Sequence, residues 1–207
     1  YLTYRPKMAK CEACQQAKMY HRQCRRSPGE TRAVRHHAKE FGEVITMDHV
    51  SSDGELGQST SGNTTALIVR DVATGWLDAY PAGSKCAEEV VASLQHFVSH
   101  AEKVGYIASD GAPEYRDACK MLGYRHRTST PGRPQTNGVA ERSVQEAIQG
   151  ARTLLQQAGA PTRWWSKAIR HYCFLHNVIR KAPGEPAPWE LRSGSAFSGP
   201  LYAFGSE

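Results

Sequence analysis

The hydrophobic and polar positions of this chain change period several times, and each change predicts a different element. Runs with β-branched residues and alternating apolar positions predict strands, whereas apolar residues spaced three and four apart predict helices. The expected strands cover residues 41–50, 64–73, 76–82, 105–109 and 124–129. The expected helices cover residues 86–100, 115–122, 139–157 and 164–179.

The order of these elements predicts an α/β fold. The turn at Thr74 and Gly75 is short enough to make the second and third strands an antiparallel hairpin. The later strands alternate with helices, and this order favours parallel pairing. We therefore expect a mixed five-stranded sheet flanked by helices in residues 38–182. Residues 1–37 form a separate arm, and the proline-rich residues 183–207 are expected to be an irregular tail.

Charge separates the arm from the body. The formal net charge is +6, but residues 1–40 hold ten Lys and Arg against three Glu, whereas residues 41–207 hold sixteen against seventeen acids. A basic arm indicates contact with a polyanion such as nucleic acid, and a solvated linker is the alternative. With 40% hydrophobic residues, wholesale disorder is not expected. No apolar stretch approaches the ~20 residues of a membrane span, so we expect no membrane partner. The chain starts at Tyr1 instead of Met, which favours a piece of a longer protein.

The arm contains a candidate zinc site. Cys11 and Cys14 have the spacing with which two thiolates bind one tetrahedral Zn²⁺ through a tight turn. His21 and Cys24 could complete the site within the chain. Two histidines upstream of Tyr1 are an equally consistent completion, and redox chemistry of the Cys pair is a third reading. We expect a small zinc-binding remnant, with its ligands beyond Cys11 and Cys14 open.

Three acids stand out by their position in the predicted body. Asp48 lies near the end of the first strand, Asp110 directly follows the fourth strand, and Glu141 lies in the first turn of the long helix. If the first and fourth strands are neighbours, all three carboxylates can reach one cleft. Clustered carboxylates need a cation, and oxygen ligands favour Mg²⁺ or Mn²⁺. Two such ions about 3.5–4 Å apart would support phosphodiester chemistry.

Each acid also has a purely structural interpretation. Asp48 could face solvent, Asp110 could begin a turn, and Glu141 could stabilise a helix N-terminus. Asp71 and Asp78 occupy similar places in the second and third strands, and spacing alone does not exclude them. From residue chemistry by itself, the metal site is therefore a weak hypothesis.

An ordered series of motifs makes the interpretation more specific. TMDHV, SDGAPEY and STPGRPQTNGVAERSVQEAIQGARTLL closely resemble the three acidic motifs of retroviral and retrotransposon integrases, and PQTNGVAER looks like the Ty1/copia group. CEACQQAKM is similar to the Cys end of the integrase His-His-Cys-Cys zinc module. Three later segments resemble the copia-type region that follows the catalytic core: WWSKAIRHYCFLHNVIRK, APWEL and LYAFGSE.

The resemblance implies an RNase H-like fold in which Asp48, Asp110 and Glu141 form a DDE triad that holds two Mg²⁺ or Mn²⁺ ions. It implies 3′-end trimming of the element's DNA and joining of those ends to target DNA. The implied partners are double-stranded DNA and further copies of the chain, and the implied location is the nucleus. Candidate DNA contacts follow from the same motif and its neighbours: Arg133, Gln135, Asn137 and Arg142.

The chain departs from the family pattern in several places. Thirty residues separate Asp110 from Glu141, which is shorter than is typical of copia-type integrases, and Asp110 is followed by Gly111 and Ala112 instead of Asn-Gly. The given residues include neither the two upstream zinc-binding histidines nor the basic C-terminal DNA-binding domain of the family pattern. A catalytically silent DNA-binding remnant of a decayed element therefore stays open as an alternative, and a plain nuclease of the same fold is a third possibility.

Overall fold

The computed structural model describes residues 10–13, 38–52, 57–99, 102–128 and 138–206. The strands are β1 (Val44–Ser51), β2 (Thr65–Asp71), β3 (Leu77–Ala82), β4 (Tyr106–Ser109) and β5 (His126–Thr128). The helices are α2 (Ala87–Phe97), α3 (Pro113–Leu122), α4 (Gly138–Ala158), the 3-10 turn η2 (Thr162–Trp164), α5 (Trp165–Val178) and α6 (Pro188–Ser193).

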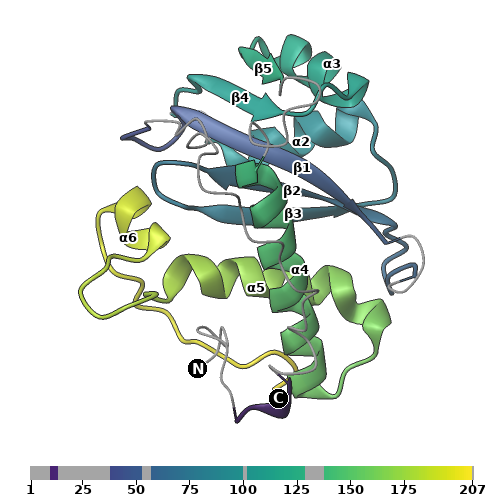
Figure 1. Cartoon of the computed structure of the whole chain (residues 1–207), viewed down its shortest axis with the longest axis vertical. Helices are drawn as coiled ribbons and strands as arrows, with labels where there is room; N and C mark the ends of the chain where they lie inside the picture. The colour runs from purple at the N-terminus through teal and green to yellow at the C-terminus, as the bar shows by residue number, and fades with distance from the viewer. Residues whose placement is uncertain (1–9, 14–37, 53–56, 100–101, 129–137, 207) are drawn as a thin grey trace, which may run out of the picture.

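The five strands form one mixed sheet in the order β3-β2-β1-β4-β5 (Figure 1). β1 pairs with β2, and β2 with β3, in antiparallel fashion, whereas β4 is parallel to β1 and β5 is parallel to β4. The expected α/β fold is confirmed, and so is the expected contact between the first and fourth strands. β1 lies in the middle of the sheet, with β4 on one side and the hairpin on the other.

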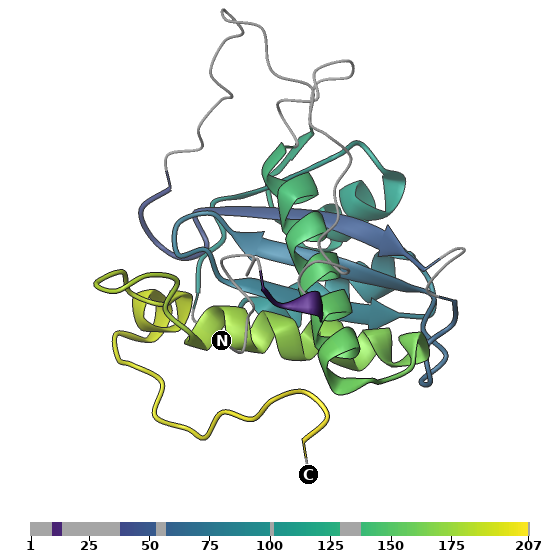
Figure 2. The ribbon, with the colours of Figure 1, turned by 60° about the horizontal axis from the view of Figure 1, so that its bottom comes forward.

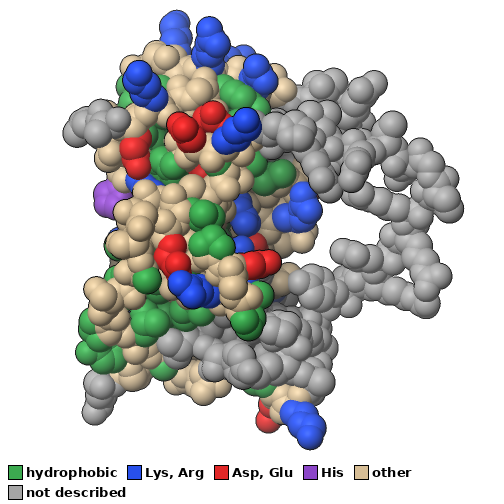
Figure 3. All heavy atoms as spheres, turned by 90° about the vertical axis from the view of Figure 1, so that its left-hand side faces the viewer, with side chains coloured by type: hydrophobic (Ala, Val, Ile, Leu, Met, Phe, Trp, Pro, Cys, Tyr) green, Lys and Arg blue, Asp and Glu red, His purple; other side chains and the backbone are tan. Residues whose placement is uncertain are grey.

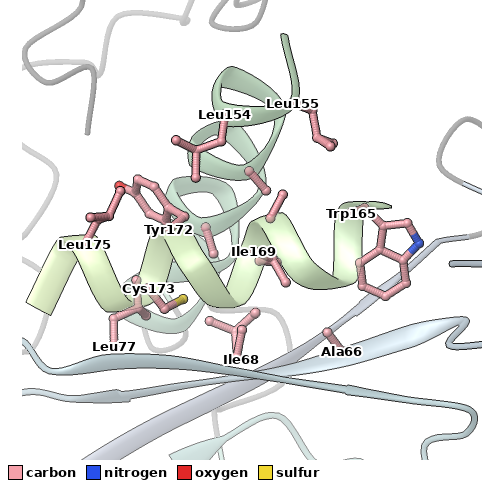
Figure 4. Packing of buried hydrophobic residues seen from close by; sticks show 14 residues of the cluster. Ala66, Ile68, Leu77, Leu154, Leu155, Trp165, Ile169, Tyr172, Cys173 and Leu175 are labelled. Atoms are coloured by element: carbon pink, nitrogen blue, oxygen red, sulfur yellow. The ribbon is translucent and has the colours of Figure 1, made fainter. Parts of the chain in front are cut away.

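Helices cover both faces of the sheet. On one face α4 and α5 pack over β1, β2 and β3, and Figure 2 shows α4 running across α5. Figure 4 shows Ala66, Ile68 and Leu77 of the sheet pointing toward α5. The opposite face carries the intervening side chains, which pack against α2 and α3: Ile45, Met47, Leu67, Val69 and Ile107. The period-2 alternation of the strands therefore produces two cores, one on each face of the sheet.

The two helices of the first face meet at a glycine. Gly150 of α4 is buried, and a Cβ at this position would overlap atoms of the Tyr172 ring of α5. Glycine thus permits the close approach of the two helices, at the cost of its low helix propensity.

Residues beyond 182 dock onto the body through α6. This helix begins at Pro188, where proline suits the first helical turn, and it ends at Gly194 with a φ of 76°. The guanidinium of Arg192 lies 3.9 Å from the centroid of the Phe41 ring and 4.6 Å from that of Trp76. It also forms an ion pair with Glu102 at 2.8 Å. A segment that we expected to be irregular therefore contributes a helix, because aromatic side chains of the body supply a surface for it.

None of the helices in the described ranges combines the length and apolar character needed to cross a lipid bilayer.

Candidate active site

The pairing of β1 with β4 brings two of the predicted acids to one edge of the sheet. Thr46 of β1 is the register partner of Ala108 in β4. Asp48 follows two residues later in β1, and Asp110 follows two residues later, directly after the end of β4. Because the strands are parallel and side chains alternate, Asp48 and Asp110 extend this register at the carboxyl edge. Asp48 is also paired with Ile68, so it lies on the sheet face that α4 covers.

Backbone donors hold both carboxylates at the strand ends. The amide of His49 donates to Asp48 Oδ1 at 2.8 Å, and the amide of Ala112 donates to Asp110 Oδ1 at 3.1 Å. The Ser109 hydroxyl donates to the carbonyl of Asp110 at 3.1 Å and shares a 2.7 Å hydrogen bond with the His126 ring. The turn after β4 is thus fixed from β5 as well as from its own backbone.

Glu141 approaches from a separate element. It lies exposed in the first turn of α4, a helix that packs on β1 and β2. Burial, together with the negative charges of Asp110 and Glu141, raises the pKa of Asp48 to about 6, although the His49 amide and the Lys85 ammonium lower it. Asp110 and Glu141 are therefore each near enough to Asp48 to affect its pKa. Within the described ranges, however, no group of three or more His, Cys, Asp and Glu side chains is close enough to hold a metal ion.

A buried pair beside Asp48 was not anticipated from the sequence. The ring of His49 stacks on Tyr115 of α3 with centroids 5.1 Å apart, and His49 Nδ1 shares a 2.7 Å hydrogen bond with the Tyr115 hydroxyl. Burial, followed by Lys85, lowers the pKa of His49 to about 4, so the ring is neutral at physiological pH. Burial and the charges of Asp48 and Asp110 raise the pKa of the Tyr115 hydroxyl. The only available signal was the helical spacing of Tyr115 with Ala118 and Cys119, which indicates a core position.

Lys85 is the second residue that sequence reasoning missed. It lies exposed between β3 and α2, and its positive charge lowers the pKa values of both Asp48 and His49. A single exposed lysine in a loop carries no signal in the sequence, and only the fold brings it near the acids.

The two other strand acids have structural roles. Asp71 is buried and accepts hydrogen bonds from the amide of Gly42 at 2.9 Å and from the amide and hydroxyl of Thr74 at 2.7 Å. Asp78 accepts from the amide of Ala79 and from the Tyr80 hydroxyl at 2.8 and 3.0 Å. Their oxygens are engaged in turns and strand contacts, which the sequence pattern could not establish.

Most of the remaining predicted site residues lie outside the described residues. These are Cys14, His21 and Cys24 of the zinc site and Arg133, Gln135 and Asn137 of the candidate DNA contacts. Cys11 is a half-buried free thiol. Arg142 is exposed, and its Nε donates to the carbonyl of Gly138 at 2.7 Å, one turn earlier in α4. A zinc site and DNA contact at these positions stay predictions.

Comparisons with known proteins agree with the fold and with the motifs. No family model matches the chain. The chain is 30% identical over 144 residues to the retrovirus-related Pol polyprotein from transposon TNT 1-94 of Nicotiana tabacum, an alignment that covers 65% of this chain and 10% of the polyprotein. The chain thus spans about a tenth of the length of this relative.

Two solved structures share the architecture. The catalytic core domain of BIV integrase matches with a TM-score of 0.55 at 19% identity, covering 74% of this chain and 95% of that one. A simian T-cell lymphotropic virus intasome chain, solved in complex with the PP2A regulatory subunit B56 gamma, matches with a TM-score of 0.64 at 18% identity, covering 93% and 66%. The resemblance inferred from the motifs is confirmed: the chain is similar in sequence to part of the retrovirus-related Pol polyproteins of transposons and has the RNase H-like fold of integrase catalytic cores.

Proposed function

We propose that this chain is the catalytic core of an integrase-type polynucleotidyl transferase, which trims the 3′ ends of the element's DNA and joins them to target DNA. The observation that carries the proposal is the placement of Asp48, Asp110 and Glu141. Three acids from β1, the turn after β4 and α4 lie close enough that the last two raise the pKa of the first. Such repulsion is unfavourable unless a cation compensates it.

The donor set fits a pair of hard divalent cations, because all three candidate ligands are carboxylates. When bound, Mg²⁺ or Mn²⁺ would activate the attacking oxygen and stabilise the leaving oxygen at phosphorus. The chain itself supplies the orientation. The His49 and Ala112 amides fix one oxygen of Asp48 and of Asp110, respectively. The packing of α4 on β1 sets the approach of Glu141.

The test is a pair of conservative substitutions that keep the shape of each acid. Asp110→Asn and Glu141→Gln should each abolish both 3′-end trimming and joining of duplex oligonucleotides to plasmid DNA in Mg²⁺ or Mn²⁺. Asp117→Asn, which changes an exposed acid of α3, is the matched control and should retain activity. Joining that survives both of the first two substitutions would overturn the assignment of the triad.

A catalytically silent DNA-binding remnant is the second candidate. It is favoured by the short segment between Asp110 and Glu141, and by the lack of a closed three-acid group in the part of the chain that the structure describes. Salt-dependent DNA binding without cleavage or joining under any divalent ion would establish it. Hydrolysed ends that are never joined would instead indicate a plain nuclease.

Partners follow from the same proposal. The likeness to integrase and intasome chains supports double-stranded DNA and further copies of this chain as partners, and nuclear action would follow from that substrate. A Zn²⁺ ion bound by Cys11 and Cys14, with His21 or Cys24, belongs to the proposal as well. Metal analysis of the purified chain before and after Cys11→Ser would test this zinc site.

A further inference from the structure

The half of the sheet beyond β1 has one face that the α4–α5 layer does not cover. α4 packs on β1 and β2, and α5 packs on β3, whereas β4 and β5 extend past both helices. Arg125 and Arg127 are exposed at this edge. Figure 3 shows that Lys and Arg side chains gather at the end of the molecule that carries β4, β5 and α3.

The strand register places one of these arginines on the same face as the acids. Arg127 is the register partner of Ala108, which is in turn the partner of Thr46. Asp48 and Asp110 each lie two residues further along their strands, so alternation puts them on the face from which Arg127 projects. The side chain of Arg127 reaches back to Tyr106, which precedes Asp110 by four residues, so at about 3.3 Å per residue its guanidinium lies roughly 13 Å from Asp110 along the strand.

The guanidinium of Arg127 is held in a defined position. Its Cζ lies 4.0 Å from the centroid of the Tyr106 ring, so the planar group stacks on an aromatic face that β4 presents. Among the described residues, neither Arg125 nor Arg127 has an acidic partner within ion-pair distance. A stacked guanidinium without a counter-ion keeps its hydrogen-bond donors available for an external anion.

We propose that Tyr106 and Arg127, with Arg125 beside them, form a platform that binds the phosphate backbone of the DNA strand entering the acidic site. The inference rests on the proposed function only in that the substrate is DNA. Phosphates recur every ~3.4 Å of rise along one strand, so an offset of about 13 Å corresponds to a phosphate roughly four nucleotides from the reacting one. Tyr106 and Arg127 are therefore positioning residues, which contact backbone and carry no base specificity.

The first experiment measures binding without catalysis. Anisotropy of a fluorescein-labelled 30-base-pair duplex is titrated with the full chain in EDTA at several KCl concentrations. Arg127→Ala should lower the slope of log K against log salt by about 0.9, the value for one lost phosphate contact, and weaken binding several-fold at 0.1 M salt. Tyr106→Phe, which keeps the ring, should bind like the unchanged chain, whereas Tyr106→Leu should bind more weakly.

A matched control separates this platform from general charge loss. Lys167 also has its charge over an aromatic ring, with Nζ 4.5 Å from the centroid of Trp164, but it lies on α5. Lys167→Ala should leave the salt slope unchanged. An equal change for Lys167→Ala and Arg127→Ala, or an unchanged slope for Arg127→Ala, would overturn the proposal. Thermal unfolding of each variant checks that the exposed substitutions leave the fold intact.

A second experiment places the contact along the strand. Single neutral methylphosphonates are introduced at successive phosphates near the joined 3′ end, and joining is measured for the unchanged chain and for Arg127→Ala. One modified position, about four nucleotides from the end, should abolish the difference between the two proteins. A difference that persists at every position would contradict the assigned contact. The binding experiment needs no divalent ion. It therefore measures the DNA contact of Arg127 even if the chain joins no DNA and the proposed function is wrong.

Discussion

The carboxylate of Asp48 suits a cation site, but in its charged form it destabilises the folded protein. Its carboxylate is partly buried near two other acids, and its pKa is about 6 against an ordinary value of 3.8. A folded-state pKa above the unfolded value means that the folded protein binds the proton more tightly. The stability contribution of Asp48 is therefore greatest below pH 4 and is lost as the pH rises through about 6.

Asp48→Asn should accordingly stabilise the metal-free protein at pH 7.5. We expect a gain of about 1–2 kcal/mol, less than the full pKa displacement gives, because solvent screens a partly exposed carboxylate. The gain should be clearly smaller at pH 4.5, where the unchanged Asp48 is already mostly protonated. Urea unfolding in EDTA at both pH values measures it, with Asp117→Asn as the control. Equal gains at the two pH values would contradict the assigned pKa.

At the scale of elements, α4 is the helix on which the site and the core both depend. It carries Glu141 at its first turn and meets α5 through Gly150 and Tyr172. It also joins β2 and α5 through Glu146, which lies 3.1 Å from Arg70 Nη1 and 2.7 Å from His176 Nδ1. Substitutions in the α4–α5 contact should therefore lower the free energy of unfolding more than they lower catalytic activity.

Gly150→Ala should destabilise the fold although alanine is the better helix former. The propensity gain of about 1 kcal/mol is smaller than the cost of forcing a methyl group into the Tyr172 ring, about 1–3 kcal/mol plus any shift of α5. Gly138→Ala, in the same helix with open space around its Cβ position, is the matched control and should be neutral or stabilising. Denaturant midpoints of the two variants and the unchanged chain measure these effects. A stabilised Gly150→Ala variant would contradict the packing described.

Glu146→Ala should be more damaging, since it leaves the buried His176 and the half-buried Arg70 without their carboxylate. The side chain of His176 is 1% exposed and that of Arg70 is 18% exposed. Removing one partner of a buried ion pair typically costs about 3–5 kcal/mol. Glu89→Ala, at an exposed position of α2, should change stability by less than about 1 kcal/mol. A similar loss from both variants in urea unfolding would argue against the buried network.

At the scale of the whole molecule, α6 joins segments of the body that are far apart in the sequence. Arg192 of α6 contacts Phe41 before β1, Trp76 before β3 and Glu102 after α2. Its fork donates to both oxygens of Glu102, at 3.1 and 2.8 Å, and also to the carbonyl of Phe97. The stacked guanidinium therefore holds segments that are far apart in the sequence.

Arg192→Lys should cost about 1–3 kcal/mol despite the conserved charge, because an ammonium can neither fork nor stack in this way. Arg180→Lys is a matched control: Arg180 makes the same two-pronged bond to Glu190, but its side chain is 55% exposed. That change should cost no more than about 1 kcal/mol. Thermal unfolding compares the two variants, and equal shifts in Tm would show that the aromatic setting of Arg192 adds nothing.

The sequence by itself determined the five strands, the helices α2 to α5 and their order, because strand alternation and helical spacing are local patterns that burial on one face imposes. It also determined which acids to consider, since their motifs occur in a specific order along the chain. It did not separate Asp48 from Asp71 and Asp78, because all three lie in or beside strands with similar neighbours. Only the parallel register of β1 and β4 brings Asp48 beside Asp110, while hydrogen bonds engage the other two.

The tertiary structure alone decided the contacts that join distant segments. The pairing of His49 with Tyr115, the charge of Lys85 near Asp48, and the stacking of Arg127 on Tyr106 each connect residues from different elements. No local period encodes such contacts, since they depend on how strands are ordered in the sheet and on which face each helix covers. The motifs therefore named the candidate acids, and the fold determined which side chains surround them.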